Sequence, residues 1–195
     1  VLVYSAVFKH RVILDVVSLS LGFVLRVLAG CAAVGAMPST WLLNSTLFLA
    51  MFLAFGKRLG ERRTMEAAGA AVETARGVQK VYSDDLLRMA VVMTAVGTLV
   101  TYAGYVEDRE GVFGPSIEAV AAGAPWGFNW LWLTMIPATY ALLRCIVLLE
   151  RGLYDDPTEL AVRDRGVQIA SICFALTAAA VWLVQGGALP AVGAA

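Results

Sequence analysis

The sequence predicts an all-α integral membrane protein, and three observations carry that prediction. Hydrophobic residues make up 59% of the chain and charged residues 15%, whereas soluble domains carry about 25% charged residues. The apolar residues gather into five runs, each long enough to cross a bilayer, which takes about 20 residues of helix. Lys and Arg are concentrated in alternate connections between these runs. We therefore expect residues 1–195 to form a single transmembrane helix bundle.

The first predicted span, residues 12–36, carries two charges that are costly to place in lipid. Asp15 and Arg26 are eleven residues apart, which is about three helical turns or about 16 Å, so both point to the same face. A polar stripe of this kind predicts a cavity, filled with water or ligand, inside the bundle. The alternative is that a neighbouring helix satisfies each charge separately.

The second predicted span, residues 39–56, ends at a charged segment. This segment reads Gly56-Lys57-Arg58-Leu59-Gly60-Glu61-Arg62-Arg63. Lys57 and Glu61 are four residues apart and would share one face of a continuing helix. The segment has two interpretations: a charged flank that ends the span, or part of a site for a phosphorylated, metal-bound ligand.

The rest of the chain alternates between polar loops and apolar spans. We expect the first of these loops to contain helix. Pro137 is expected to kink a span that also contains Arg144. The predicted elements are, in order, a polar loop at 57–85, spans at 86–106 and 130–149, a polar loop at 150–165 and a last span at 166–185.

Basic residues are distributed very unequally between the two sides of the predicted bundle. Twelve lie on the side that holds residues 1–11 and the loops 57–85 and 150–165, whereas Arg109 stands alone on the other side. The positive-inside rule places the side with twelve in the cytoplasm. We therefore expect a multi-pass protein of the plasma membrane, with an active site that faces the cytoplasm.

The polar groups of that cytoplasmic half suit phosphate chemistry. Arg and Lys side chains bind phosphate oxygens, and Mg²⁺ is often held by one or two carboxylates together with substrate phosphates. A cavity that opens sideways to lipid could admit a polyprenyl chain. The residues concerned are Lys9, Asp15, Lys57, Arg58, Glu61, Tyr82 and Arg144.

Several other classes of site are not indicated by the sequence. It contains no P-loop, no dinucleotide-binding glycine pattern and no zinc signature. The three cysteines lie in apolar runs without the spacing of metal ligands. Because the basic residues are not interleaved with exposed aromatic residues, we do not expect the protein to bind nucleic acid.

Several segments resemble a known family, the UbiA-type polyprenyl transferases. The segment Tyr4-Ser5-Ala6-Val7-Phe8-Lys9-His10-Arg11-Val12-Ile13-Leu14-Asp15 is similar to the pattern that leads into a central helix of that family. Other motifs resemble a narrower branch, the decaprenyl-phosphate phosphoribosyltransferases of actinobacterial cell-wall synthesis. These motifs are Gly22 to Gly30, Gly56 to Glu61, Leu143-Arg144 and Asp156 to Arg165. Their order and spacing carry the resemblance, which extends from Tyr4 to about Val184.

The resemblance implies a UbiA-like bundle and a phosphoribosyl transfer. A 5-phosphoribosyl group would pass from phosphoribosyl diphosphate to a polyprenyl phosphate, while Mg²⁺ and basic residues stabilise the diphosphate that leaves. Lys57, Glu61 and Asp15 would be the catalytic residues. The implied contacts are Lys57 and Arg58 to phosphate, Glu61 to Mg²⁺ or ribose hydroxyls, and Lys9 and Arg26 to a phosphate group. Asp15 and Tyr82 would be orienting residues or ribose contacts, and Arg144 would be a further substrate-binding residue.

The family also implies nine transmembrane helices, of which these five would be the last. We therefore expect the natural protein to begin upstream of Val1 and to carry a first Asn-Asp-rich motif there. Two other functions stay open. One is transfer of a prenyl group from its diphosphate to an aromatic or other acceptor, which generally uses a second Asp-rich motif. The other is a non-enzymatic membrane scaffold or transporter. A homo-oligomer is compatible with each.

Overall fold

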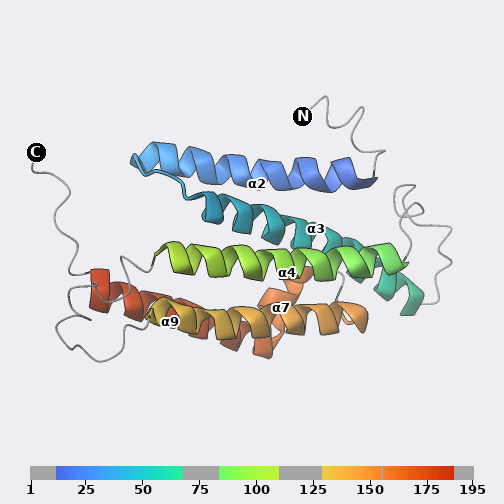
Figure 1. Cartoon of the computed structure of the whole chain (residues 1–195). Coiled ribbons are helices and arrows are strands. Elements are labelled where there is room, and N and C mark those ends of the chain that lie inside the picture. The colour runs from blue at the N-terminus through green and yellow to red at the C-terminus, as the bar shows by residue number, and fades with distance from the viewer. Residues whose placement is uncertain (1–11, 68–83, 110–128, 155, 187–195) are drawn as a thin grey trace, which may run out of the picture.

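The computed structural model describes residues 12–67, 84–109, 129–154 and 156–186, and within these ranges it contains helices and no strand. Five helical stretches are long and apolar enough to cross a membrane, which confirms the predicted all-α membrane bundle. Figure 1 shows the long helices side by side, with successive ones running in opposite directions. The elements are α2 (Val12–Val34), α3 (Thr40–Ala67), α4 (Asp84–Asp108), the 3-10 helix η4 (Trp130–Thr134), α7 (Met135–Glu150), α8 (Pro157–Arg163) and α9 (Arg165–Gly186).

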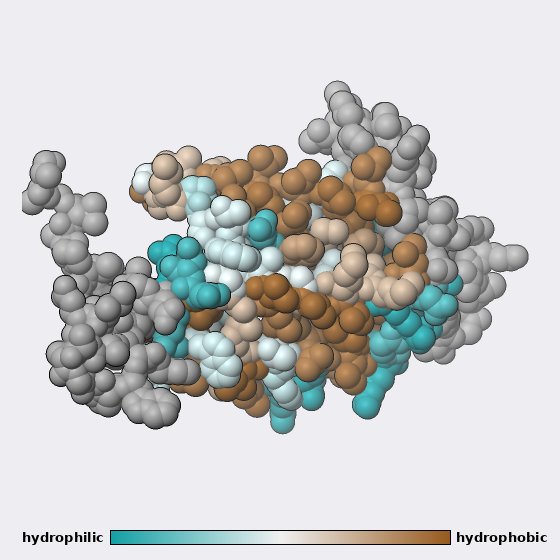
Figure 2. Space-filling view, viewed as in Figure 1, coloured by the Kyte–Doolittle hydropathy of each residue, from teal (hydrophilic) through white to brown (hydrophobic). Residues whose placement is uncertain are grey.

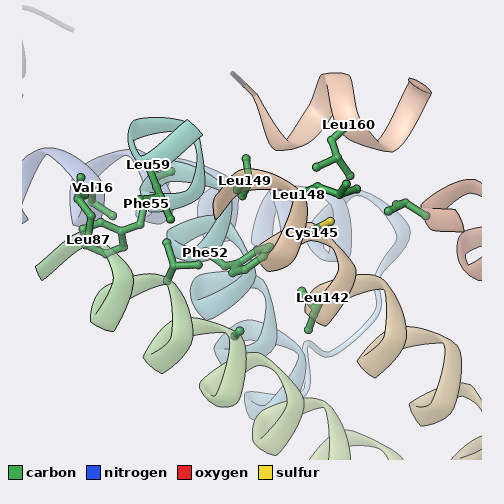
Figure 3. Packing of buried hydrophobic residues seen from close by; sticks show 14 residues of the cluster. Val16, Phe52, Phe55, Leu59, Leu87, Leu142, Cys145, Leu148, Leu149 and Leu160 are labelled. Carbon is green, nitrogen blue, oxygen red and sulfur yellow. The ribbon is translucent and has the colours of Figure 1, made fainter. Parts of the chain in front are cut away.

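Helix α3 packs against four other helices, α2, α4, α7 and α8. Its buried residues Phe52 and Leu59 pack with Leu87 of α4, Leu149 of α7 and Leu160 of α8 (Figure 3). Lipid tails are as apolar as these side chains, so close packing rather than removal from water holds such a core together. The surface over the middle of the helices is apolar, with hydrophilic groups toward the two ends (Figure 2).

Helix α3 is longer than the second predicted span. It continues through Gly56 to Ala67, so the first eleven residues of the predicted loop 57–85 are helical. The segment is rich in Lys, Arg, Leu and Glu, which favour helix. Gly56 does not end the helix but allows a close contact: a Cβ there would lie 3.0 Å from Pro157 Cγ and 3.1 Å from Leu149 Cδ1.

The fourth span begins with η4 and continues as α7. The expected kink at Pro137 is not found inside a continuous helix, because Pro137 is the third residue of α7. A proline in the first helical turn removes no intrahelical hydrogen bond, since the N–H groups of that turn have no helical acceptor. The change in helix type falls before the proline, between Thr134 and Met135.

The predicted loop 150–165 contains the short helix α8. Asp156 caps this helix, because its Oδ1 accepts a hydrogen bond from the Thr158 N–H at 2.9 Å, and Pro157 follows at the first helical position, which suits proline. Asp164 ends α8, and its Oδ1 accepts from the Val167 N–H at 2.9 Å near the start of α9. Two capping aspartates therefore define a helix that the composition of the loop did not reveal.

Candidate functional site

One end of the bundle gathers ion pairs between helices, and we call it the charged end. It consists of the first turns of α2 and α4, the last turns of α3 and α7, and α8. In Figure 1 the starts of α2 and α4 and the ends of α3 and α7 lie on the right. This is the end at which the sequence predicts the active site.

Asp15 and Arg58 join α2 to α3 at the charged end. Arg58 Nη2 donates to Asp15 Oδ2, and Arg58 Nη1 donates to the Ala54 carbonyl at 2.9 Å. Their side chains are only 8% and 18% exposed, respectively. A carboxylate buried in this way needs a cation beside it. Of the two interpretations of Asp15, the structure therefore supports the one in which a neighbouring helix satisfies the charge.

Arg26 is not brought to this pair. It lies about three turns further along α2, it is exposed, and its guanidinium carbon is 5.4 Å from the centre of the Phe23 ring. Such a cation–π contact provides a partner for an arginine at an apolar surface. The helical spacing thus places Asp15 and Arg26 on one face without placing them in one site, and the cavity along that face stays a prediction.

Lys57 and Asp156 join α3 to the start of α8. Lys57 Nζ donates to Asp156 Oδ2 at 2.7 Å, and the side chains are 53% and 26% exposed, respectively. Burial acts to raise the pKa of Asp156, but hydrogen bonds from Lys57 and Thr158 outweigh it, so the pKa lies below its ordinary value of 3.8. Lys57 is thus a half-exposed cation held in place by a carboxylate from a distant part of the chain.

Asp156 is absent from the predicted site residues, although its segment is one of the motifs that carry the resemblance. The signal that could have found it is the Asp-Pro pair. A proline at the first helical position, with an aspartate before it, marks a helix start. Because a capping side chain has a fixed direction, a capping aspartate that faces another helix can hold a cation there.

Arg144 is paired within the bundle. Its Nε and Nη2 donate to the two oxygens of Asp164 at 2.6 and 3.0 Å, and its Nη1 donates to Tyr140 Oη at 3.3 Å. The hydrogen bond from Arg144 is the largest effect that lowers the pKa of Asp164, to about 2. Gly166 leaves room for this pair, since a Cβ there would collide with the Arg144 guanidinium group. The geometry accounts for Arg144 as a contact that holds α7 to the start of α9.

A second ion network, which we call the Arg63 network, joins the ends of α3, α4 and α7. Arg63 bridges two acids: its Nη1 is 2.8 Å from Asp84 Oδ2, and its Nε is 3.7 Å from Glu150 Oε2. Arg62 Nε is 2.6 Å from Asp84 Oδ1, and Arg88 Nε is 3.0 Å from Glu150 Oε1. The prediction of a loop at 57–85 missed this network, because it placed Arg63 and Asp84 in one loop, whereas they lie on two different helices, and because Glu150 lies on a third.

The remaining predicted site residues are placed as follows. Glu61 is half-buried on α3, one turn after Lys57. Lys9 and Tyr82 lie outside the described residues. Among the residues that the structure describes, no group of three or more His, Cys, Asp or Glu side chains could hold a metal ion. A single carboxylate such as Glu61 suits Mg²⁺ only when substrate oxygens complete its coordination.

The chain is similar to curated proteins from three bacteria, while no family model matches it. A decaprenyl-phosphate phosphoribosyltransferase of Mycolicibacterium smegmatis is 32% identical over 170 residues, which cover 86% of this chain and 50% of that protein. Proteins of the same name from Mycobacterium tuberculosis and Corynebacterium glutamicum are 28% and 30% identical over 179 and 171 residues, respectively, covering 92% and 88% of this chain.

The chain spans about half the length of the curated relatives it matches, between 47% and 54%. The matched part includes most of the five helices that could cross a membrane. Together, the helix bundle and these similarities show that the chain is related to the decaprenyl-phosphate phosphoribosyltransferases, and so to the UbiA-type polyprenyl transferases that its motifs resemble.

Proposed function

We propose that this protein is a membrane transferase that moves a 5-phosphoribosyl group from phosphoribosyl diphosphate to a polyprenyl phosphate. The observation that carries the proposal is the similarity to decaprenyl-phosphate phosphoribosyltransferases over 86% or more of the chain. By the same similarity, the acceptor is decaprenyl phosphate and the product serves arabinan precursor synthesis for the cell wall. We place the protein in the plasma membrane, and the count of twelve basic residues against one supports an orientation in which the charged end faces the cytoplasm.

In this reaction an oxygen of the lipid phosphate attacks the anomeric carbon of the ribose. The bond from that carbon to the diphosphate oxygen breaks, and the diphosphate leaves with the electron pair. Negative charge develops on the leaving group, so fixed cations near it lower the barrier. Positioning of two anionic substrates supplies the rest, and the chemistry needs no protein nucleophile.

Lys57 is the side chain that fits the contact to the leaving diphosphate. It is a cation, it is half exposed, and Asp156 holds it at a fixed place about three turns before the end of α3. Arg58 neutralises Asp15, and we assign to this pair the task of holding α2 against α3 beside Lys57. Glu61, one turn further on, would contact the ribose hydroxyls or Mg²⁺, and that ion would neutralise charge on the diphosphate.

The proposal is tested with the natural protein reconstituted in vesicles. Phosphoribosyl diphosphate labelled in the ribose is incubated with decaprenyl phosphate, and label in the lipid phase is measured over time. We expect transfer that depends on both substrates. The matched control is Arg163→Ala, which removes an exposed cation of α8 that pairs with its own helix neighbour Glu159, and it should leave the rate unchanged. Transfer from a prenyl diphosphate to an aromatic acceptor, with no labelled lipid, would overturn the proposal.

A further inference from the structure

We propose that Asp156 is a positioning residue for the reaction, which acts by fixing Lys57 at the junction of α3 and α8. The inference rests on the proposed function, because it assumes that Lys57 contacts the leaving diphosphate. Its basis is the geometry of one carboxylate that serves two different elements. The first element is its own helix, α8. The second is α3, whose residue Lys57 lies 99 residues from Asp156 in the chain.

The two oxygens of Asp156 have separate partners. Oδ1 accepts hydrogen bonds from the N–H and the hydroxyl of Thr158, at 2.9 and 2.7 Å, respectively. Oδ2 accepts from Lys57 Nζ at 2.7 Å. Because the cap fixes the plane and direction of the carboxylate, it also fixes the place at which the Lys57 ammonium group is held.

The helix that Asp156 caps, α8, packs against the buried core of the bundle. Pro157, next to Asp156, is buried against Gly56, the residue before Lys57. Leu160 is fully buried and belongs to the same core cluster as Leu149 of α7. Figure 3 shows Leu160 of α8 pointing toward the α7 side chains. The backbone of Asp156 therefore cannot move away from that of Lys57 unless α8 leaves the core.

A lysine side chain needs a partner to fix its position more than an arginine side chain does. Its ammonium group is a point charge on a flexible stem, so its position depends on what holds it. An ammonium group has three N–H donors, so the hydrogen bond to Asp156 does not by itself exclude a contact to phosphate. The Arg144–Asp164 pair is different, because that guanidinium is held by both oxygens of a carboxylate whose side chain is only 11% exposed.

The decisive variant is Asp156→Asn. Asparagine caps helices as well as aspartate does, so α8 is preserved while the charge that holds Lys57 is removed. Because the contact to a leaving diphosphate strengthens as charge develops, we expect kcat to fall about tenfold or more. The KM for phosphoribosyl diphosphate should change less than about threefold, and Tm should stay within about 2 °C of the unchanged protein. Glu159→Gln, which removes an exposed acid from the same helix, should leave kcat unchanged.

A second measurement reports on Lys57 without using activity. The protein is treated with a water-soluble amine-acylating reagent, and modification of Lys57 is followed by mass spectrometry, with Lys80 as the internal reference. Asp156→Asn should speed acylation of Lys57 relative to Lys80 by at least about threefold, because the ionic hydrogen bond from the Lys57 ammonium group to Asp156 is lost. Unchanged acylation, or a wild-type kcat in this variant, would overturn the inference. If the unsubstituted protein transfers no phosphoribosyl group, the proposed function fails instead, and the acylation ratio still decides whether Asp156 holds Lys57.

Discussion

Lys57 and Arg63 lie less than two turns apart on α3, yet their surroundings differ. Arg63 is 14% exposed and bridges Asp84 and Glu150. Lys57 is 53% exposed and is held by Asp156. An arginine that bridges two acids can tie three helices together, because its planar group presents several donors at fixed angles. A half-exposed lysine contributes little to such a scaffold but presents a cation at the surface.

The backbone around Arg63 reinforces this difference. Gly152, in the turn after α7, has φ of 62° and lies against the Arg63 carbonyl, where a Cβ would be 3.0 Å from the oxygen. Thr64 Oγ1 donates to the Gly152 carbonyl at 3.4 Å. A positive φ suits glycine, so the turn can follow α3 closely. The Arg63 network therefore belongs to the scaffold, whereas Lys57 belongs to the candidate site.

The largest effect is expected from Lys57→Ala. Removal of one preorganised donor to developing charge typically costs a factor of about 10² to 10³ in kcat, and we expect a loss of that size in labelled-lipid formation. Because the Lys57–Asp156 pair is exposed, Tm should change little. If the variant keeps more than about half of the rate, Lys57 is only part of the charged segment that follows the second span. A large drop in Tm would likewise contradict the separation of site from scaffold.

The opposite behaviour is expected from Arg63→Met. This change leaves Asp84 and Glu150 with fewer cations in a partly buried place, and we expect a loss of about 2 kcal/mol in the free energy of unfolding. Thermal unfolding in detergent measures it, and kcat per folded molecule should stay within about threefold. Arg163→Met is the matched control, since Arg163 is 69% exposed. Loss of kcat without loss of stability would place Arg63 in the site.

A smaller loss of stability is expected from Gly56→Ala. The added Cβ would meet Pro157 Cγ at 3.0 Å and Leu149 Cδ1 at 3.1 Å, so α8 must shift away from α3, at a cost of about 1–2 kcal/mol. Gly30→Ala is the control, because a Cβ there meets no atom within 4 Å, and alanine favours helix over glycine by about 0.5–1 kcal/mol. Equal unfolding temperatures for the two variants would show that α8 does not depend on this contact.

The smallest effect is confined to low pH. The pKa of Asp164 is lowered from 3.8 to about 2 in the folded protein, first by the hydrogen bond from Arg144. The pair therefore contributes its full stability above the ordinary pKa of 3.8 and loses it as the pH falls through about 2. We expect Tm to decline over this range in the unchanged protein and to decline less in Asp164→Asn. Identical pH profiles would show that the Arg144–Asp164 pair does not stabilise the fold.

Much of the architecture was predictable because it depends on local properties. The predicted spans 86–106 and 166–185 differ by one or two residues from α4 and α9 at each end, since a membrane helix satisfies its backbone hydrogen bonds within itself. The predicted bounds are wrong where a charged segment is helical. Helix α3 continues past the predicted end of its span at Gly56, although the expectation of helix in the loop 57–85 is confirmed, and α8 lies inside the predicted loop 150–165.

The candidate site was predictable only in part. Composition and motif spacing pointed to Lys57, Arg58, Glu61 and Asp15, and the structure places all four on α2 and α3 at the charged end. Neither composition nor spacing could pair Lys57 with a residue 99 positions away, or Arg58 with one 43 positions away. The partner of Arg144 could not be predicted either, because Asp164 lies beyond α8.

The amino-acid sequence by itself therefore determined the class of protein, the number of described spans and the end at which the charges gather. Hydrophobic length and charge content act within each segment, and they need no knowledge of its neighbours. Only the tertiary structure decided which charges neutralise one another and which cation stays exposed. That outcome depends on which helix faces meet, and the close contact at Gly56 places Asp156 beside Lys57.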